Sequence, residues 1–241
     1  RDRNYIFFAC ITYYMNVYTY YENINFSKQE NLIEIWKKSW EDKGFKAIVL
    51  TRKDAESHSF FGKFCEKLKQ LHLDIVGKEL QDYGLSCYLR WLAYANTLKE
   101  PSFVCDYDVI NIRLENNHKI DNKLNLYDNC CPCFASGTAK QFLAFCLDIL
   151  RISDQNLNSL RGNVQPWYHD QEFIAHNEFQ VKNFSYIHVD GRDPNESLVQ
   201  LYKHQDSFIT NNSKVLHFAH ASIGQTKENF PELKDENSDE L

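Results

Sequence analysis

The chain has little of what a membrane-spanning or nucleic-acid-binding protein needs. None of its apolar runs approaches the roughly 20 residues that a helix needs to cross a bilayer. The formal net charge at pH 7 is −6, so the chain lacks the basic footprint with which proteins bind nucleic acid. We therefore predict no membrane span and no nucleic-acid partner. A phosphate-bearing ligand still suits an acidic protein if a metal ion screens the repulsion.

Cysteine and histidine pairs at metal-site spacing are scarce as well. Of the eight cysteines, three lie in apolar runs, where cysteine behaves as a small buried hydrophobe: Cys10, Cys105 and Cys146. Three others cluster at Cys130, Cys131 and Cys133, but no second Cys/His pair follows at the spacing of a zinc site. Ordinary packing is therefore favoured over a structural zinc.

The indications of cellular compartment conflict. Cysteines of this reduced type favour the cytoplasm. Four Asn-x-Ser sequons and a Ser-Asp-Glu-Leu ending are instead typical of the ER or Golgi lumen. The chain begins at Arg1, so the sequence also leaves open whether a leader or anchor once preceded it.

Apolar runs and helical patterns alternate along the first half of the chain. Buried strands are predicted at residues 4–14, 46–50 and 102–110, and amphipathic helices at residues 31–43, 60–73 and 86–98. Gly44 is predicted to end the first helix. Such alternation implies crossover connections and a mostly parallel central sheet flanked by helices, an α/β fold.

The second half is less regular. A helix is predicted at residues 139–152, a polar loop at 152–166, and short strands at 186–189 and 214–218. No internal repeat or low-complexity linker divides the chain, so we predict a single domain over residues 1–226 and a charged C-terminal tail over 227–241.

Aromatic residues gather in two places. Trp36 and Trp40 stand at helical spacing, which favours core packing over a sugar-binding platform. Five tyrosines allow two interpretations: they line a pocket for a base or sugar, or they form the ordinary amphipathic surface of a core strand. They are Tyr13, Tyr14, Tyr18, Tyr20 and Tyr21.

Two carboxylates mark the end of the third predicted strand. In open parallel sheets, ligands bind beyond the carboxyl ends of the strands, where Asp106 and Asp108 fall. Alternate residues of an extended strand share one side, so we expect the two side chains to converge while Tyr107 faces away. Carboxylate oxygens suit Mg²⁺ or Mn²⁺. The alternative is a solvated strand end that caps the next turn.

Several segments, taken in order, resemble the nucleotide-binding half of GT-A glycosyltransferases. A helix carrying Arg90 precedes the strand that bears Asp106-Tyr107-Asp108, and residues 47–55 resemble the second strand of that fold and its loop. Residues 169–172 (His-Asp-Gln-Glu) are similar to an acceptor-side motif, and residues 215–218 (Val-Leu-His-Phe) to a late strand whose histidine binds metal. The likeness runs over about residues 4 to 220, although a Lys-Pro-Trp ending after His217 is missing.

The resemblance implies a GT-A, Rossmann-like fold with a nucleotide-binding half at 1–110 and an acceptor half at 111–226. It implies three ligands for Mn²⁺ or Mg²⁺: Asp106, Asp108 and His217. Asp106 would also meet the diphosphate through the cation, and further donor contacts would come from Thr12, Tyr13, Arg52, Asp54 and Arg90. Asp170, or else Glu172, would meet the acceptor hydroxyl.

Each of these roles has an ordinary alternative. His217 is otherwise a satisfied core histidine, with His220 as a rival ligand, and Arg90 is otherwise a surface ion-pair partner. Asp170 and Glu172 also suit the first turn of a helix, where the dipole favours acids.

The implied activity is transfer of a sugar from a nucleoside-diphosphate sugar, UDP by default and GDP as the alternative, to a hydroxyl of a carbohydrate or protein acceptor. If the reaction inverts the anomeric centre, Asp170 is the candidate base. Two other functions stay open. Asp106 also resembles the nucleophile of haloacid-dehalogenase-like phosphatases, although the acidic pair that they place downstream is missing here. The third function is that of a non-catalytic binding module of the glycosyltransferase type.

Overall fold

The structure, a computed structural model, describes residues 15–24, 30–120, 123–127, 132–155, 157–161, 170–175, 187–189 and 214–218. The strand predicted at 4–14 lies outside these ranges, and so do Thr12, Tyr13, Cys130, Cys131 and His220. Within the described residues, no helix combines the length and the apolar character that a membrane span requires.

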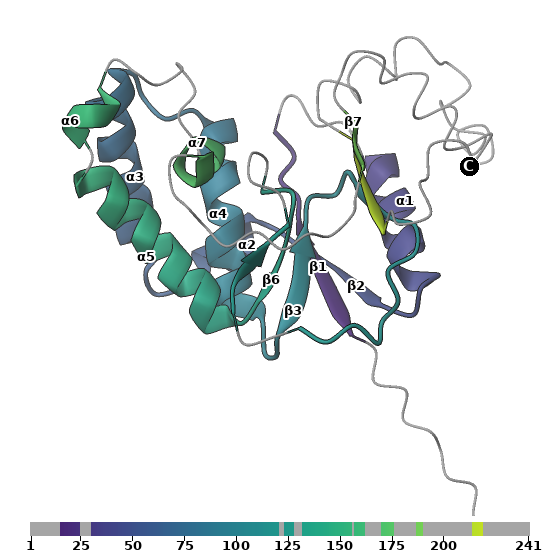
Figure 1. Ribbon diagram of the computed structural model, residues 1–241. Helices are drawn as coiled ribbons and strands as arrows, with labels where there is room; N and C mark the ends of the chain where they lie inside the picture. The colour runs from purple at the N-terminus through teal and green to yellow at the C-terminus, as the bar shows by residue number, and fades with distance from the viewer. Residues whose placement is uncertain are drawn as a thin grey trace, which may run out of the picture.

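A five-stranded sheet forms the centre of the molecule, in the order β2-β1-β3-β6-β5 (Figure 1). Its strands are β1 (Asn16–Tyr20), β2 (Lys46–Leu50), β3 (Ser102–Cys105), β5 (Asn125–Leu126) and β6 (Phe134–Gly137). β1 pairs in parallel with β2 and β3, whereas β6 runs antiparallel to both β3 and β5. Only β6 therefore opposes the common direction within this sheet, and the predicted mostly parallel sheet is confirmed.

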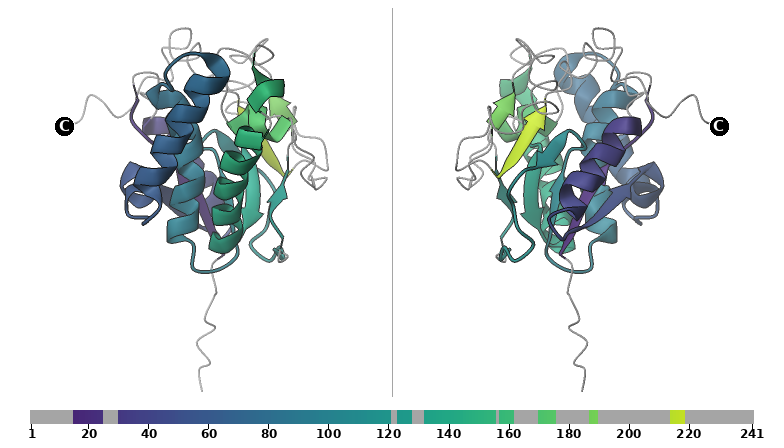
Figure 2. Two further views of the ribbon diagram at one scale, coloured as in Figure 1. Left: turned by 90° about the vertical axis from the view of Figure 1, so that its left-hand side faces the viewer. Right: turned by 90° about the vertical axis from the view of Figure 1, so that its right-hand side faces the viewer.

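Helices cover both faces of this sheet, as the two side views show (Figure 2). α1 (Glu30–Glu41) covers one face, and α2 (Arg52–Glu56), α4 (Asp82–Thr97) and α5 (Ala139–Gln155) share the core on the other. α3 (Phe61–Val76) packs on the outside of these three helices. Because strand side chains alternate, Val17 of β1 joins the core beneath α1 and Tyr18 joins the core beneath α4. The short helices α6 (Leu157–Leu160) and α7 (Asp170–Ala175) contact the α3 and α5 side.

The two tryptophans of α1 are core residues, as predicted, and are fully buried. One donates a hydrogen bond to the last residue of the central strand β3, and the other to the segment that follows β3. Trp36 Nε1 lies 3.2 Å from Cys105 Sγ, and Trp40 Nε1 lies 3.1 Å from the carbonyl oxygen of Val109. These bonds fix α1 to the chain immediately before and after Asp106-Tyr107-Asp108.

The strand predicted at 102–110 is in fact two strands in different sheets. β3 ends at Cys105, and the chain then turns before β4 (Val109–Asn111) begins. β4 belongs to a second sheet, ordered β4-β8-β7, with β7 (Ile187–Val189) and β8 (Val215–Phe218). β4 is antiparallel to β8, and β7 is parallel to it. The prediction of one continuous strand was wrong because the polar turn interrupts the apolar run.

Gly44 ends α1 in the left-handed conformation, with φ of +79°. A Cβ added there would lie 2.7 Å from Asn116 Nδ2, which donates a hydrogen bond to the Gly44 carbonyl oxygen. We expect Gly44→Ala to lower the free energy of unfolding by about 1–2 kcal/mol, since the substitution adds backbone strain to a steric clash. Urea denaturation measures this change.

Gly62 of α3 provides the matched control. A Cβ there would meet nothing within 4 Å, and the residue has no positive φ. Gly62→Ala should raise stability by roughly 0.5–1 kcal/mol, because alanine favours the helix. Equal effects of the two substitutions would contradict the helix-ending role of Gly44.

Candidate metal centre

Asp106-Tyr107-Asp108 forms a tight turn between the two sheets. The Val109 amide donates to the Asp106 carbonyl oxygen at 3.1 Å, which closes a four-residue turn, and the Asp106 amide donates to the Cys133 carbonyl oxygen at 2.8 Å. Aspartate is favoured at the first position of such turns. The two carboxylates therefore share a turn and not one side of an extended strand, so the expected convergence has a different cause from the one predicted.

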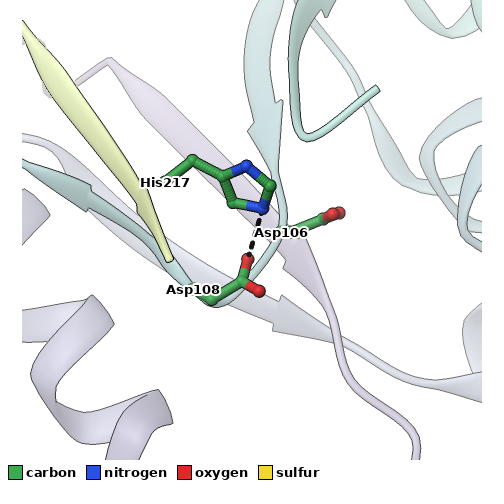
Figure 3. Close-up of side chains that lie close together, drawn as sticks. All are labelled: Asp106, Asp108 and His217. Atoms are coloured by element: carbon green, nitrogen blue, oxygen red, sulfur yellow. Dashed lines mark ion pairs between the residues drawn. The ribbon is translucent and has the colours of Figure 1, made fainter. Parts of the chain in front are cut away.

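His217 reaches this turn through strand pairing. Antiparallel pairing of β4 with β8 sets His217 opposite Val109, next to Asp108. The imidazole and the Asp108 carboxylate face each other, with Nε2 3.6 Å from Oδ1 (Figure 3). One ligand atom from each of Asp106, Asp108 and His217 lies within 4.8 Å of the other two. The structure thus brings together the three residues that the resemblance implied as metal ligands.

The cluster is largely buried. The side chains of His217 and Asp108 are 3% and 5% exposed, whereas that of Asp106 is 25% exposed. Carboxylates taken out of water need a cation or hydrogen-bond donors to offset the lost hydration. Asp106 is the most solvent-exposed member of the cluster.

The two carboxylates and the imidazole of the cluster are a ligand set that fits a divalent cation. Two carboxylates suit Mg²⁺ and Mn²⁺, and an imidazole nitrogen favours a transition metal over Mg²⁺, which prefers oxygen. Two ligands of one such ion lie at most roughly 4.2 Å apart, so side-chain shifts of less than about 1 Å would close these three around it. Of the two ions predicted from the sequence, Mn²⁺ suits the set better.

Arg90 of α4 is buried beside the cluster, which corrects the alternative of a surface ion pair. Its side chain is 11% exposed. Nη1 pairs with Asp106 Oδ1, while Nε and Nη2 lie 3.1 and 2.6 Å from Asp170 Oδ2. Trp91 Nε1 also donates to Asp170 Oδ2, at 2.7 Å. One guanidinium therefore bridges the candidate metal centre and the first residue of α7.

Burial and the neighbouring charges of Asp108 and Arg90 act on the pKa of Asp106 in opposite directions. Burial raises the pKa of the Asp106 carboxyl, the adjacent Asp108 raises it further, and the Arg90 guanidinium opposes both. A cation at the cluster would act in the same direction as Arg90, because it favours the ionised carboxylate.

The other predicted donor residues lie at the same edge of the sheet but already have partners. Arg52 pairs with Glu22 at 2.9 Å and with Glu56 at 3.1 Å. Asp54 accepts hydrogen bonds from the Thr51 amide and hydroxyl at 2.7 and 3.0 Å, which caps α2. Sequence reasoning missed Glu22, whose only signal is its position just after the predicted tyrosine wall.

The tyrosines divide between the two interpretations. Tyr18 and Tyr20 are core residues, 4% and 8% exposed, as expected of an amphipathic wall. Tyr21 instead contacts Tyr107, the middle residue of the turn between Asp106 and Asp108, edge to face, with ring centroids 5.5 Å apart. An aromatic pair therefore borders the candidate metal centre. Tyr13 and Tyr14 lie outside the described residues.

The acceptor-side residues lie in α7. Asp170 is its first residue and is 1% exposed, and Glu172 follows two positions later. Both residues lie in the first turn of α7, where the helix dipole favours acidic side chains, as the alternative interpretation predicted. The buried contacts of Asp170 with α4 had no signal in local sequence, because Arg90 and Asp170 lie 80 positions apart.

The chain was also compared with known proteins. No model of a known protein family matches it, and neither does any curated protein. Among solved structures it is similar to the apo form of the glycosyltransferase GlyE from Streptococcus pneumoniae TIGR4, with a TM-score of 0.45 and 11% sequence identity. The match covers 86% of this chain and 54% of the other, so the chain spans about half the length of that protein.

Proposed function

We propose that the chain is a metal-dependent glycosyltransferase that moves a sugar from a nucleoside-diphosphate sugar to an acceptor hydroxyl. The observation that carries this proposal is the grouping of Asp106, Asp108 and His217 within 4.8 Å, immediately after the central parallel strand β3. Ligands of open α/β sheets bind beyond the carboxyl ends of their strands. A cation held there is placed to meet a diphosphate.

The roles of the residues follow from their positions. Asp106, Asp108 and His217 would hold Mn²⁺ or Mg²⁺, and the bound ion would stabilise the charge that develops on the departing diphosphate. Asp106 is the most exposed of the three and faces the donor in this proposal. The aromatic pair Tyr21–Tyr107 borders the same place and sets two rings, edge to face, beside the proposed donor position. UDP-sugars are the first donors to test and GDP-sugars the second.

Thermal unfolding with nucleotide and metal tests the proposal. UDP or GDP together with Mn²⁺ should raise the melting temperature, because a ligand that binds only the folded state at 100 times its Kd stabilises by about 2.7 kcal/mol. For a chain of this length that corresponds to a rise of roughly 5–10 °C. Hydrolysis of a panel of nucleotide sugars with Mn²⁺ then identifies the donor.

The same measurement separates the proposal from its rivals. Nucleotide without Mn²⁺, or with EDTA, should give a much smaller rise. Stabilisation by Mg²⁺ and a phosphate mimic alone would favour the phosphatase, with Asp106 as nucleophile. A melting temperature that responds to none of these ligands would favour a non-catalytic module and refute the transferase.

A further inference from the structure

The Asp170 carboxylate is enclosed by donors from α4. Its Oδ2 accepts two hydrogen bonds from Arg90 and one from the Trp91 indole, and the residue is 1% exposed. A general base must come within hydrogen-bond reach of the hydroxyl whose proton it takes. A buried carboxylate that already holds a guanidinium and an indole is badly placed for that task, so its geometry calls for another role.

Arg90 connects this carboxylate to the candidate metal centre. Nε and Nη2 are held by Asp170, while Nη1 pairs with Asp106. Because the guanidinium is planar and rigid, fixing one edge fixes the direction of the remaining N–H groups. The orientation of the Asp106 carboxylate is thereby set from α7, through a single side chain of α4.

The charges of Arg90, Asp106 and Asp170 also indicate that Asp170 supports the metal centre. A buried guanidinium beside Asp106 would by itself repel an incoming cation. Asp170 supplies the opposite charge within 2.6 Å, so the Arg90–Asp170 pair is neutral as a unit. Groups that orient a metal-binding side chain in this manner typically change metal affinity by about 10- to 100-fold when they are removed.

We propose that Asp170 is a positioning residue of the metal centre and acts through Arg90, which it neutralises and holds in line with Asp106. This inference rests on the metal centre of the proposed function, but it does not depend on which sugar or acceptor is used. It differs from the role of proton acceptor that the sequence suggested for Asp170.

A double-mutant cycle with Mn²⁺ affinity as the readout tests the inference. Affinity is measured by calorimetry and by the electron paramagnetic resonance signal of free Mn²⁺, for wild type, Asp170→Asn, Arg90→Gln and the double variant. Asp170→Asn should weaken Mn²⁺ binding by about 10-fold or more. In the Arg90→Gln background the same substitution should change affinity by less than about twofold, because the residue through which Asp170 acts is gone.

Kinetics supply a second readout. With a nucleotide sugar that the wild type hydrolyses, Asp170→Asn should raise the Mn²⁺ concentration needed for half-maximal rate and leave the rate at saturating Mn²⁺ largely intact. Asp82→Asn, at an exposed position in the first turn of α4, is the control and should change neither quantity.

Three results would overturn the inference. An equal loss of affinity in both backgrounds would show that Asp170 acts on the cation by charge alone. Unchanged affinity with a rate lost at every Mn²⁺ concentration would restore the proton-acceptor role. If Arg90→Gln does not fold, Asp170→Glu replaces the cycle, since it keeps the charge and moves the carboxylate; unchanged Mn²⁺ affinity in that variant would also overturn the inference.

Failure of the proposed function gives a different pattern. A wild-type protein that binds Mn²⁺ but hydrolyses no nucleotide sugar would remove the transferase proposal and leave the affinity cycle valid. A wild-type protein that binds no Mn²⁺ would remove the metal centre and this inference together.

Discussion

Asp108→Ala should reduce Mn²⁺-dependent hydrolysis of nucleotide sugars by about 1,000-fold or more. In the proposed reaction the metal would contribute several kcal/mol to stabilising the departing diphosphate, and about 4 kcal/mol corresponds to a factor of about 1,000 in rate. Removing a buried carboxylate that faces His217 at 3.6 Å leaves the cation with one charged ligand in place of two. Initial rates over a range of Mn²⁺ concentrations measure the effect.

Asp42→Ala is the matched control for this substitution. Asp42 follows α1, pairs with Lys38 at 3.0 Å, and its side chain is 57% exposed. An exposed pair of this kind contributes less than about 1 kcal/mol, so rate and melting temperature should both stay close to wild type. An Asp108→Ala enzyme that keeps more than about a tenth of the wild-type rate would refute the metal assignment.

The largest expected effect on stability belongs to Arg90→Met. This change leaves Asp170, 1% exposed, without the cation that holds it. Breaking a buried ion pair by removing one partner costs about 3–5 kcal/mol, because an uncompensated charge stays behind. Urea denaturation with EDTA present, so that no metal contributes, should show this loss of unfolding free energy.

Two further variants sharpen this test. Arg52→Met removes a guanidinium from partly exposed pairs with Glu22 and Glu56 and should cost less than about 1 kcal/mol. The double variant Arg90→Met with Asp170→Leu removes both charges of that pair, leaves only the partly exposed Asp106 without its guanidinium, and should recover most of the lost stability. If Arg90→Met were no more harmful than Arg52→Met, the buried bridge between α4 and α7 would be disproved.

Local pattern was sufficient wherever a segment had one clear periodicity and a clear stop. β2 coincides with the predicted strand at 46–50, and α1 lies within two residues of its predicted bounds and is followed by Gly44. These elements follow from apolar spacing and from the left-handed conformation that glycine tolerates.

The two acidic residues, Asp106 and Asp108, were predicted to lie close together, as they do, but the segment that bears them was predicted as an extended strand and forms a turn. The run from Ser102 to Ile110 is apolar enough to indicate one strand. What divides it is the pairing of Val109 with His217 in a second sheet. A partner more than a hundred positions away leaves no mark on local periodicity, so the local signal for the turn is limited to the preference of aspartate for its first position.

The buried position of Arg90 was missed for a related reason. α4 is covered by the sheet on one side and by α5 on another, and it buries every residue from Tyr88 to Tyr94. A helix enclosed in this way has no polar stripe from which the exposure of a single arginine can be predicted. Only the position of Asp170 in space explains why a charge is tolerated there.

The distance along the chain between Asp108 and His217 has a consequence for how the protein acquires its site. His217, the third member of the cluster, lies on β8 near the end of the described chain, and it can reach the two aspartates only after β8 has joined β4. Contacts between such remote segments form late, because closing a long loop is entropically unfavourable. A nascent chain released before residue 214 would therefore carry both aspartates and still be unable to complete the cluster, so competence for metal should appear only once synthesis has passed β8.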